Sequence, residues 1–428
     1  MERYSEYKDS GVKWLGEIPS HWELLKSKYL WKETFENSTS GKEDLLSVSQ
    51  YTGVTKSKAD SRSESLIGSK IVHKDDLVIN IMLAWLGGLG VSNDEGVVSP
   101  AYCTYKLIRD YNPKFLHYLY KTPMYLAEFA RHSTGVVPSR WRMYTDDFGQ
   151  VVSLLPPVEE QDTIVRYLDA ATSKIDKAIA MQQKMIDLLN ERKQIIIQNA
   201  VTKGLDENVE MKDSGVEWIG MIPKHWEIKR LKYVMHSYGR IGFRGYGTDD
   251  IVDEGQGAIT LSPSNIQDSS MDYSKKTYLS WSKYYESPEI MIKNGDVLMV
   301  KTGSSYGKCA VVKGLPMECT INPQLVVFKE HKELPEFLAY SFQTTYAKCF
   351  INTSVIGGTI PTISQEKINN YIFPFPPKTE QQAIVAYLDK EMQRFDSAIS
   401  NCQRQIALLQ ERKQIIINEV VTGKVKVS

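Results

Sequence analysis

The sequence contains the same long, helix-like segment twice. Residues 155–204 and 375–424 align without a gap, so that Pro156 corresponds to Pro376 and every later pair stays in step. This correspondence is called here the repeat register. An unbroken register of this length indicates one structural unit that is made twice. It restricts the possible architecture, because an amphipathic helix needs a partner to cover its apolar stripe.

Apolar residues recur along each copy with the seven-residue spacing of a coiled-coil seam. The two prolines before each copy suit the first turn of a helix, where a missing N–H group costs nothing. At ~1.5 Å per residue each helix would be on the order of 60 Å long, and its narrow stripe favours a single partner helix. We therefore predict that the two copies pair with each other as an antiparallel coiled coil. The predicted helix-pairing residues are Leu168, Ile175, Ile179, Ile186 and Leu189 in the first copy and Leu388, Phe395, Ile399, Ile406 and Leu409 in the second.

The segment that opens the chain also returns. The stretch Lys8–Trp22 recurs as Lys212–Trp226, and each copy is followed by short apolar runs between turn residues. The order is therefore lobe, long helix, lobe, long helix. This is a tandem duplication rather than a solenoid, whose repeats are about 20–50 residues long.

Strand-like runs with a little helix in each lobe predict an α+β fold. We expect two strand-rich domains, each followed by one of the long helices. The predicted boundaries are residues 1–155 for the first domain, 156–200 for the first long helix, 201–211 for a linker, 212–375 for the second domain, and 376–428 for the second long helix with a C-terminal tail.

The composition is that of an ordinary globular protein. Hydrophobic residues make up 42% and charged residues 24% of the chain, and no apolar run is long enough to span a bilayer. The five cysteines form no CxxC pair, and the first residues do not resemble a targeting peptide, which favours the cytoplasm. The formal net charge is zero. A neutral chain argues against nucleic-acid binding unless its positive charge lies on one face.

No motif supports catalysis by this chain alone. The stretch Gly303–Cys309 resembles a phosphate-binding loop, but it has too few residues between its glycines and ends in cysteine where Ser or Thr would bind magnesium. The stretch Ser99–Tyr102 lacks the second proline of the amino-methyltransferase motif, so a turn that enters a strand is the stronger interpretation. The seven histidines show no metal-ligand spacing, and the equivalent His21 and His225 are interpreted as structural.

Basic and aromatic residues meet in three loops whose chemistry suits DNA. Arginine can bind guanine through two hydrogen bonds, lysines and hydroxyls hold phosphates, and glycines let backbone N–H groups come close. Without other support, ordinary solvated loops are the favoured interpretation. The candidate DNA-binding residues are Ser139, Arg140, Arg142 and Tyr144 in the first lobe and Arg240, Arg244, Lys301, Thr302, Ser304, Ser305 and Lys308 in the second.

The two repeated sequence motifs, called here phrases, resemble those of the specificity subunit of type I restriction–modification enzymes. The helix phrase is Leu-Pro-Pro … Glu-Gln … Leu-Asp … Ile-Asp … Glu-Arg-Lys … Val-Thr, and the phrase that opens a lobe is Ser-Gly-Val-Glu-Trp-Ile-Gly … Ile-Pro … His-Trp-Glu. The resemblance covers essentially the whole chain, because each phrase occurs twice and the two alternate.

The resemblance implies that each lobe is a target recognition domain that reads one half of a split double-stranded DNA site. It also implies that the long helices are the family's conserved regions, which pack antiparallel as a spacer and dock two methyltransferase subunits, and that restriction subunits join the assembly. S-adenosylmethionine, ATP and magnesium would then belong to these partners, and this chain would bind no cofactor. Recognition domains vary greatly in this family, so the candidate DNA contacts rest on their chemistry alone.

Two other functions stay open at this point. The chain could be a single-chain DNA methyltransferase or nuclease with an unrecognised site, or a coiled-coil scaffold without a role on DNA. If the chain is a specificity subunit, its lobes should read different half-sites, because Arg140 and Trp141 align with Ile363 and Ser364.

Overall fold

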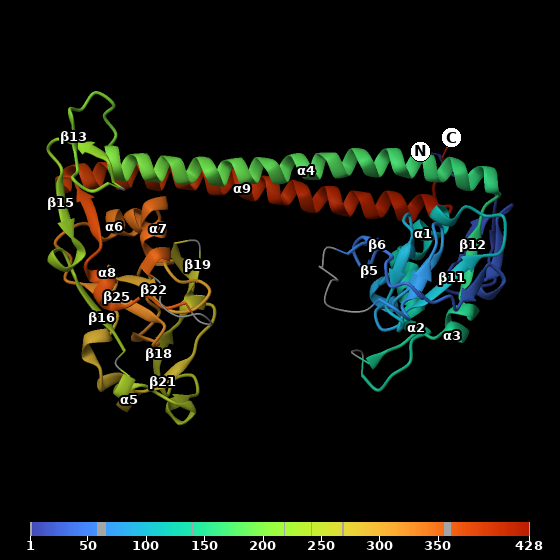
Figure 1. The fold of residues 1–428 in the computed structure, drawn as a ribbon, viewed down its shortest axis with the longest axis horizontal. Coiled ribbons are helices and arrows are strands. Elements are labelled where there is room, and N and C mark those ends of the chain that lie inside the picture. Colours follow the sequence, from blue (N-terminus) through green and yellow to red (C-terminus); the bar gives the residue numbers. More distant parts are fainter. Residues whose placement is uncertain are drawn as a thin grey trace. The chain divides into compact units, whose positions relative to one another are not determined.

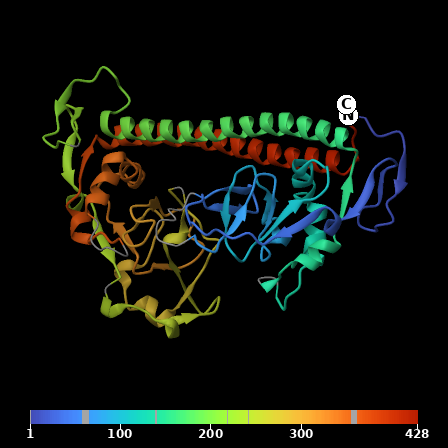
Figure 2. The ribbon, with the colours of Figure 1, turned by 45° about the vertical axis from the view of Figure 1, so that its right-hand side comes forward.

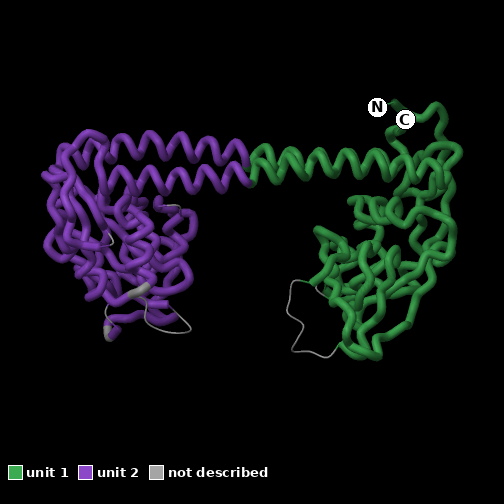
Figure 3. The backbone as a smooth tube through the Cα atoms, turned by 45° about the horizontal axis from the view of Figure 1, so that its top comes forward, with its two compact units in different colours: residues 1–183, 403–428 green, residues 184–402 purple. Residues whose placement is uncertain are grey.

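The structure, a computed structural model, describes residues 2–57, 66–137, 140–217, 219–240, 242–267, 269–354 and 361–427. It divides the chain into two compact units (Figure 3). Unit 1 consists of residues 1–183 and 403–428, and unit 2 of residues 184–402. Each unit therefore contains one strand-rich lobe and a part of each long helix. The predicted division into consecutive domains, linker and helices is not tested by these units and stays a prediction.

The two long helices are α4 (Val158–Lys203) and α9 (Lys378–Val421), which run side by side (Figures 1 and 2). In unit 1 the early residue Ile164 of α4 shares a hydrophobic core with Val421 at the end of α9. Further along α4, Lys413 Nζ lies 2.7 Å from Asp176 Oδ1. The two helices are therefore antiparallel in this unit.

Unit 2 repeats this arrangement with the roles of the helices exchanged. Lys193 Nζ of α4 lies 2.6 Å from Asp396 Oδ1 of α9, and Ile197 of α4 shares a core with Ile384 of α9. In the repeat register this ion pair is the counterpart of the one in unit 1. The predicted antiparallel pairing of the long helices is confirmed.

The burial of the two helices follows the predicted seam. The predicted helix-pairing residues are all buried or half-buried, and Leu168 and Leu388 are completely so. Residues on the neighbouring faces, by contrast, are exposed: Leu188 by 50% and Leu408 by 58%. The seam is therefore narrow and leaves an outer face of each helix open to solvent. Among the described residues, no helix is both long and apolar enough to cross a membrane.

Each long helix begins against its own lobe through a buried glutamine. The Gln161 amide donates to the carbonyl of Pro156 at 2.7 Å, and its oxygen accepts the N–H of Asn112 at 2.9 Å. Gln381 repeats both bonds, with the carbonyl of Pro376 and with the N–H of Leu334. Each glutamine thus satisfies a carbonyl in the loop before its long helix and an N–H group elsewhere in the same lobe.

A carboxylate in the first turn of each helix accepts two further bonds from the lobe opening. Glu160 accepts from Trp22 Nε1 at 3.3 Å and lies 2.8 Å from His21 Nε2. Glu380 has the same relation to Trp226 and His225, at 3.1 and 2.8 Å. This position suits an acidic residue because the N-terminus of a helix carries partial positive charge. The contacts support a structural role for both histidines.

The strand and helix bounds of the first lobe are β1 (Tyr7–Asp9), β2 (Glu17–Pro19), β3 (Glu23–Lys26), β4 (Trp31–Thr34), β5 (Leu46–Ser49), β6 (Gly53–Lys56), β7 (Lys70–Val72), β8 (Leu77–Ile79), β9 (Leu89–Val91), β10 (Gly96–Val98), β11 (Cys103–Leu107), α1 (Pro113–Tyr120), α2 (Pro123–Arg131), α3 (Thr145–Gln150) and β12 (Val152–Leu155). An antiparallel sheet in the order β4-β11-β8-β9 forms its centre. The lobe also contains the two-stranded sheets β1-β2, β3-β12, β5-β6 and β7-β10.

The elements of the second lobe are β13 (Met211–Asp213), β14 (Met221–Pro223), β15 (Glu227–Arg230), β16 (His236–Gly239), β17 (Ile251–Val252), β18 (Gly257–Leu261), β19 (Ile266–Gln267), β20 (Ser270–Met271), β21 (Tyr278–Ser280), α5 (Trp281–Tyr285), β22 (Val297–Val300), β23 (Cys309–Val311), β24 (Cys319–Ile321), β25 (Leu325–Lys329), α6 (Pro335–Phe342), α7 (Thr345–Ser354), α8 (Gln365–Asn369) and β26 (Ile372–Phe375). The antiparallel sheet β16-β25-β22-β23 repeats the central sheet of the first lobe. A second sheet, β17-β21-β18-β24, extends this lobe. The predicted α+β class is confirmed.

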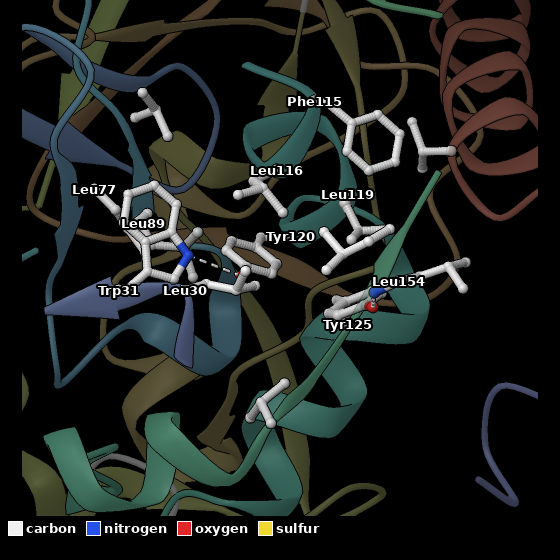
Figure 4. Packing of buried hydrophobic residues seen from close by; sticks show 14 of the residues in the cluster. Leu30, Trp31, Leu77, Leu89, Phe115, Leu116, Leu119, Tyr120, Tyr125 and Leu154 are labelled. Carbon is white, nitrogen blue, oxygen red and sulfur yellow. Dashed lines mark hydrogen bonds between the residues drawn. The ribbon is translucent and has the colours of Figure 1, made fainter. Parts of the chain in front are cut away.

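The core of the first lobe forms where α1 covers the central sheet (Figure 4). Phe115 and Leu119 of α1 are completely buried, and Trp31 Nε1 donates to the Tyr120 hydroxyl at 3.0 Å. The Tyr120 hydroxyl also lies 2.7 Å from Ser153 Oγ, so both buried polar atoms of this contact have partners. The core holds the sheet rigid and so fixes the loops at the ends of its strands.

Truncation of the seam should distinguish buried from exposed leucines. Leu168→Ala and Leu388→Ala should each lower the free energy of unfolding by about 2–5 kcal/mol, because each leaves a cavity in a packed interface. The matched exposed variants Leu188→Ala and Leu408→Ala should change it by less than about 0.5 kcal/mol. Thermal unfolding of the four variants measures the difference. Equal unfolding temperatures in all four would contradict the assigned seam.

Candidate nucleic-acid interface

The candidate residues of the first lobe lie between α2 and α3, in a segment that projects beyond α2 in Figure 1. Thr134 and Arg142 exchange two backbone hydrogen bonds of 3.0 and 2.9 Å, which makes a hairpin of this segment, called here the α2–α3 loop (residues 132–144). Arg140 and Tyr144 are exposed and Arg142 is half-buried. Within the described part of the chain neither arginine forms an ion pair. Ser139 lies outside the described residues.

A second loop, which joins β8 to β9 (residues 80–88), packs against the α2–α3 loop. The N–H of Met143 donates to the carbonyl of Ile81 at 3.0 Å. The rings of Trp85 and Trp141 meet edge to face with their centroids 5.3 Å apart. The structure thus places a loop that sequence reasoning did not select directly beside the candidate arginines.

The β8–β9 loop holds apolar side chains toward solvent in a fixed conformation. The side chain of Asn80 accepts the N–H of Met82 at 3.2 Å, and the carbonyl of Leu83 accepts the N–H of Gly88 at 2.8 Å. A Cβ at Gly88 would lie only 2.7 Å from the Cβ of Leu83, so the turn requires glycine there. Met82, Leu83 and Leu86 are each 38–40% exposed as a result.

The second lobe has the same pair of loops at the same place in its sheet. Its β22–β23 loop (residues 301–308) is joined to residues 361–364 by a bond of 2.9 Å from the N–H of Ile363 to the carbonyl of Lys301. The offset that relates Pro156 to Pro376 also relates Ile81 to Lys301 and Met143 to Ile363, so the repeat register extends into the lobes and this bond is the counterpart of the bond between Met143 and Ile81. Gly303 adds a bond of 3.0 Å to the carbonyl of Pro361.

The shared bond corrects the alignment of the two lobes. Sequence comparison paired Arg140 with Ile363, whereas the structure places Met143 at the position of Ile363. Both are nearly fully buried, at 1% exposure. The glycines in the two segments led to the shifted alignment. In the repeat register Arg142 instead corresponds to Thr362, so the two lobes still differ at this loop.

The candidate residues of the β22–β23 loop form a polar surface. Lys308 and Ser304 are exposed, while Lys301, Thr302 and Ser305 are half-buried. Burial lowers the pKa of the Lys301 ammonium, because removal from water disfavours the charged form.

The two candidate loops of the second lobe also meet. A Cβ built at Gly239, at the end of β16, would lie 3.2 Å from Lys301 Nζ. The chain at Gly239 therefore approaches the lysine closely, and the residues that follow Gly239 begin beside the β22–β23 loop.

Arg240, however, is held inside the lobe. It is 5% exposed, its Nε donates to the carbonyl of Ile321 at 3.0 Å, and its Nη2 donates to Thr320 Oγ1 at 3.1 Å. Its guanidinium also lies over the ring of Tyr246, and burial lowers its pKa. These contacts argue against the predicted DNA contact of Arg240 and give the side chain a structural role instead.

Arg244 is partly accessible but already has a partner. Its Nη1 lies 3.2 Å from Glu289 Oε1, and 34% of its side chain is exposed. A contact with a base would require this ion pair to open or to share its arginine. The DNA contact of Arg244 stays a prediction, as do those of the loop residues described above.

The two lobes therefore present one geometry with different chemistry. In the first lobe the cations lie on the α2–α3 loop and the β8–β9 loop is apolar. In the second lobe the cations Lys301 and Lys308 lie on the β22–β23 loop. Arginines, lysines and hydroxyls on projecting loops can bind phosphates and base edges. Among the residues that the structure describes, no group of three or more His, Cys, Asp or Glu side chains is placed to hold a metal ion.

Comparisons with known proteins agree on one family. The model of the type I restriction modification DNA specificity domain matches residues 223–410. The chain is 25% identical over 278 residues to the type I restriction enzyme MjaVIII specificity subunit of Methanocaldococcus jannaschii, covering 64% of this chain and 62% of that protein. It is 23% identical over 281 residues to the EcoKI specificity subunit of Escherichia coli, covering 63% of this chain and 57% of that protein. The chain thus spans less than two thirds of the length of these curated relatives.

Solved structures share the fold over nearly the whole chain. A chain from a study of complex assembly and conformational transition in the type I R-M system superposes with a TM-score of 0.71 at 17% identity, covering 95% of this chain and 99% of that one. The HsdS subunit from Thermoanaerobacter tengcongensis superposes with a TM-score of 0.50 at 18% identity, covering 95% and 98%. The shared fold includes both lobes and both long helices.

Substitution of two arginines should separate a structural role from a surface role. Arg240→Ala should lower the free energy of unfolding by about 1–3 kcal/mol, because the buried carbonyl of Ile321 would lose its donor. Arg140→Ala, at an exposed position, should change it by less than about 0.5 kcal/mol. Thermal unfolding monitored by circular dichroism checks both values. An Arg240→Ala variant as stable as the parent would show that the side chain is not needed for folding and reopen its role on DNA.

Proposed function

Because the chain is similar to type I restriction enzyme specificity subunits, we propose that it is such a subunit and directs a restriction–modification complex to a split DNA site. Each lobe reads one half-site. The observation that carries this proposal is the repeated pair of loops, held by the same backbone bond in both lobes but lined by different side chains. One scaffold with two loop chemistries suits two different short sequences.

The long helices act as the spacer between the two half-sites. Each helix begins in one unit and ends in the other, which supports a role as a spacer. Two lobes on a rigid spacer would bind about one turn of the DNA double helix apart, roughly 34 Å. The expected target is therefore two short blocks separated by bases that are not read.

The exposed faces of the helices dock two methyltransferase subunits, and restriction subunits join this assembly. Equivalent apolar residues support two equivalent sites: Leu188 and Leu408 are 50% and 58% exposed, and Ile195 and Ile415 are 44% and 47% exposed. Duplicated surfaces favour two copies of one partner. The lobe openings around Trp14 and Trp218 complete these docking surfaces, and Trp218 lies outside the described residues.

The chain itself catalyses nothing and binds no cofactor under this proposal. S-adenosylmethionine, ATP and magnesium act in the partner subunits, and the assembly works in the cytoplasm, where its DNA substrate is. What this chain supplies is the position of the partners on the DNA. Methyl transfer by the purified chain without any partner would overturn this part of the proposal.

Replacing single loop cations should change recognition in one block only. Arg140→Ala should cost about 1–3 kcal/mol in binding and relax one position of one block, and Arg244→Ala should do so in the other block. Lys308→Ala should instead weaken binding to all sequences and reduce the salt dependence, as expected for a phosphate contact. Methylation profiles of the assembled enzyme measure the specificity. If both arginine variants keep the parental site and rate, these loops do not read DNA.

Single substitutions on the helices should remove one methyltransferase at a time. The parent should assemble with two methyltransferases per chain, Leu188→Asp or Leu408→Asp with one, and the double variant with none, because a charge would be buried against an apolar partner. Leu205→Asp, at a 44% exposed position off the helices, is the control. Native mass spectrometry counts the subunits. A parent complex with one methyltransferase would contradict the duplicated docking surface.

A further inference from the structure

The two equivalent loops carry different side chains at matching positions. In the repeat register, Met82, Leu83 and Leu86 of the β8–β9 loop correspond to Thr302, Gly303 and Tyr306. Hydrogen bonds to the backbone of the β8–β9 loop fix the conformation in which these apolar side chains are exposed. Adjacent exposed apolar side chains on a fixed loop are typical of a contact surface.

We propose that the β8–β9 loop reads thymine in the half-site of the first lobe, by apolar contact with the C5-methyl groups in the major groove. This inference rests on the proposed function and specifies the chemistry of one block of the target. Of the four bases only thymine presents an apolar group in the major groove, and apolar side chains recognise it by contact.

The neighbours of the loop favour DNA as its occupant. The edge-to-face contact of Trp85 with Trp141 and the bond from Met143 to Ile81 join the apolar loop to the loop that carries Arg140 and Arg142. Two cations beside an apolar tip match a surface on which methyl groups lie between phosphates. Both loops would then meet the same block.

The duplication argues against a methyltransferase as the occupant. A partner that docks twice needs the same surface in both lobes, whereas the counterpart of this apolar surface is Thr302, Gly303 and Tyr306. This apolar surface is present in the first lobe alone. It therefore suits a ligand that differs between the lobes, as two different half-sites do. The fixed loop also loses little conformational freedom on binding, which favours affinity.

Deoxyuridine in place of thymidine tests the proposal, because it removes only the methyl group. Once methylation profiling has identified the two blocks, duplexes carrying this replacement in each block separately are bound to the assembled enzyme. Binding should weaken about three- to fivefold for each methyl removed from the block that the first lobe reads, as expected for a buried group of this size. A first block without thymine, or one insensitive to the replacement, overturns the proposal.

Variants of the loop connect the effect to its residues. Met82→Ala and Leu86→Ala should bring the ratio of binding to the thymidine and deoxyuridine duplexes toward one in that block only. Ile251→Ala is the control, since Ile251 is 38% exposed like Met82 but lies on β17 of the second lobe. Unfolding temperatures equal to the parent confirm that the variants fold.

Each remaining outcome is decisive. Loss of a methyltransferase from the Met82→Ala complex with an unchanged thymidine preference would make the loop a protein-docking surface and overturn the proposal. A parent complex that prefers its target over a scrambled duplex but ignores the methyl groups overturns this inference and leaves the proposed function intact. A parent complex without that preference overturns the proposed function itself.

Discussion

The last turns of each long helix belong to the core of the lobe from which the other helix starts. Ile197 and Val201 near the end of α4 are fully buried in unit 2, and Val420 and Val421 at the end of α9 are fully buried in unit 1. Burying an aliphatic side chain of this size stabilises a fold by about 1.5–3 kcal/mol. In the antiparallel pair the last turns of each helix therefore help to complete the core of the lobe from which the other helix starts.

This shared scaffold leaves the loops free to differ. The bond from the N–H of Met143 to Ile81, and its counterpart from Ile363 to Lys301, involves only backbone atoms. It therefore holds the loops in place whatever their side chains are. Met143 and Ile363, at one end of the bond, are nearly fully buried and must fit the core, whereas the half-buried residues at the other end, Ile81 and Lys301, differ between the lobes. A duplicated protein can in this way keep one fold and acquire two specificities.

The long helices were predictable because their heptad period is local and was repeated without a gap. The role of Arg240 was not, because its partner Ile321 lies 81 residues further along the chain. Nothing in its glycine-rich neighbourhood distinguishes a buried guanidinium from an exposed one. The β8–β9 loop was missed because an apolar run resembles core. The loop could have been found from the sequence, because it aligns with Lys301–Lys308, the segment that contains candidate DNA-binding residues of the second lobe. This alignment appears when the repeat register is extended from the helices into the lobes.

A formal net charge of zero does not exclude DNA binding by this chain. Many carboxylates are engaged within the fold: Asp176 and Asp396 pair with lysines across the helices, and Asp147 accepts the N–H of Tyr144 at the start of α3. Arg140 and Arg142 form no ion pair within the described part of the chain. Because the Debye length at 0.1 M salt is about 10 Å, distant carboxylates do not cancel the potential of these arginines. DNA binding therefore depends on the local charge at the loops and not on the net charge of the whole chain.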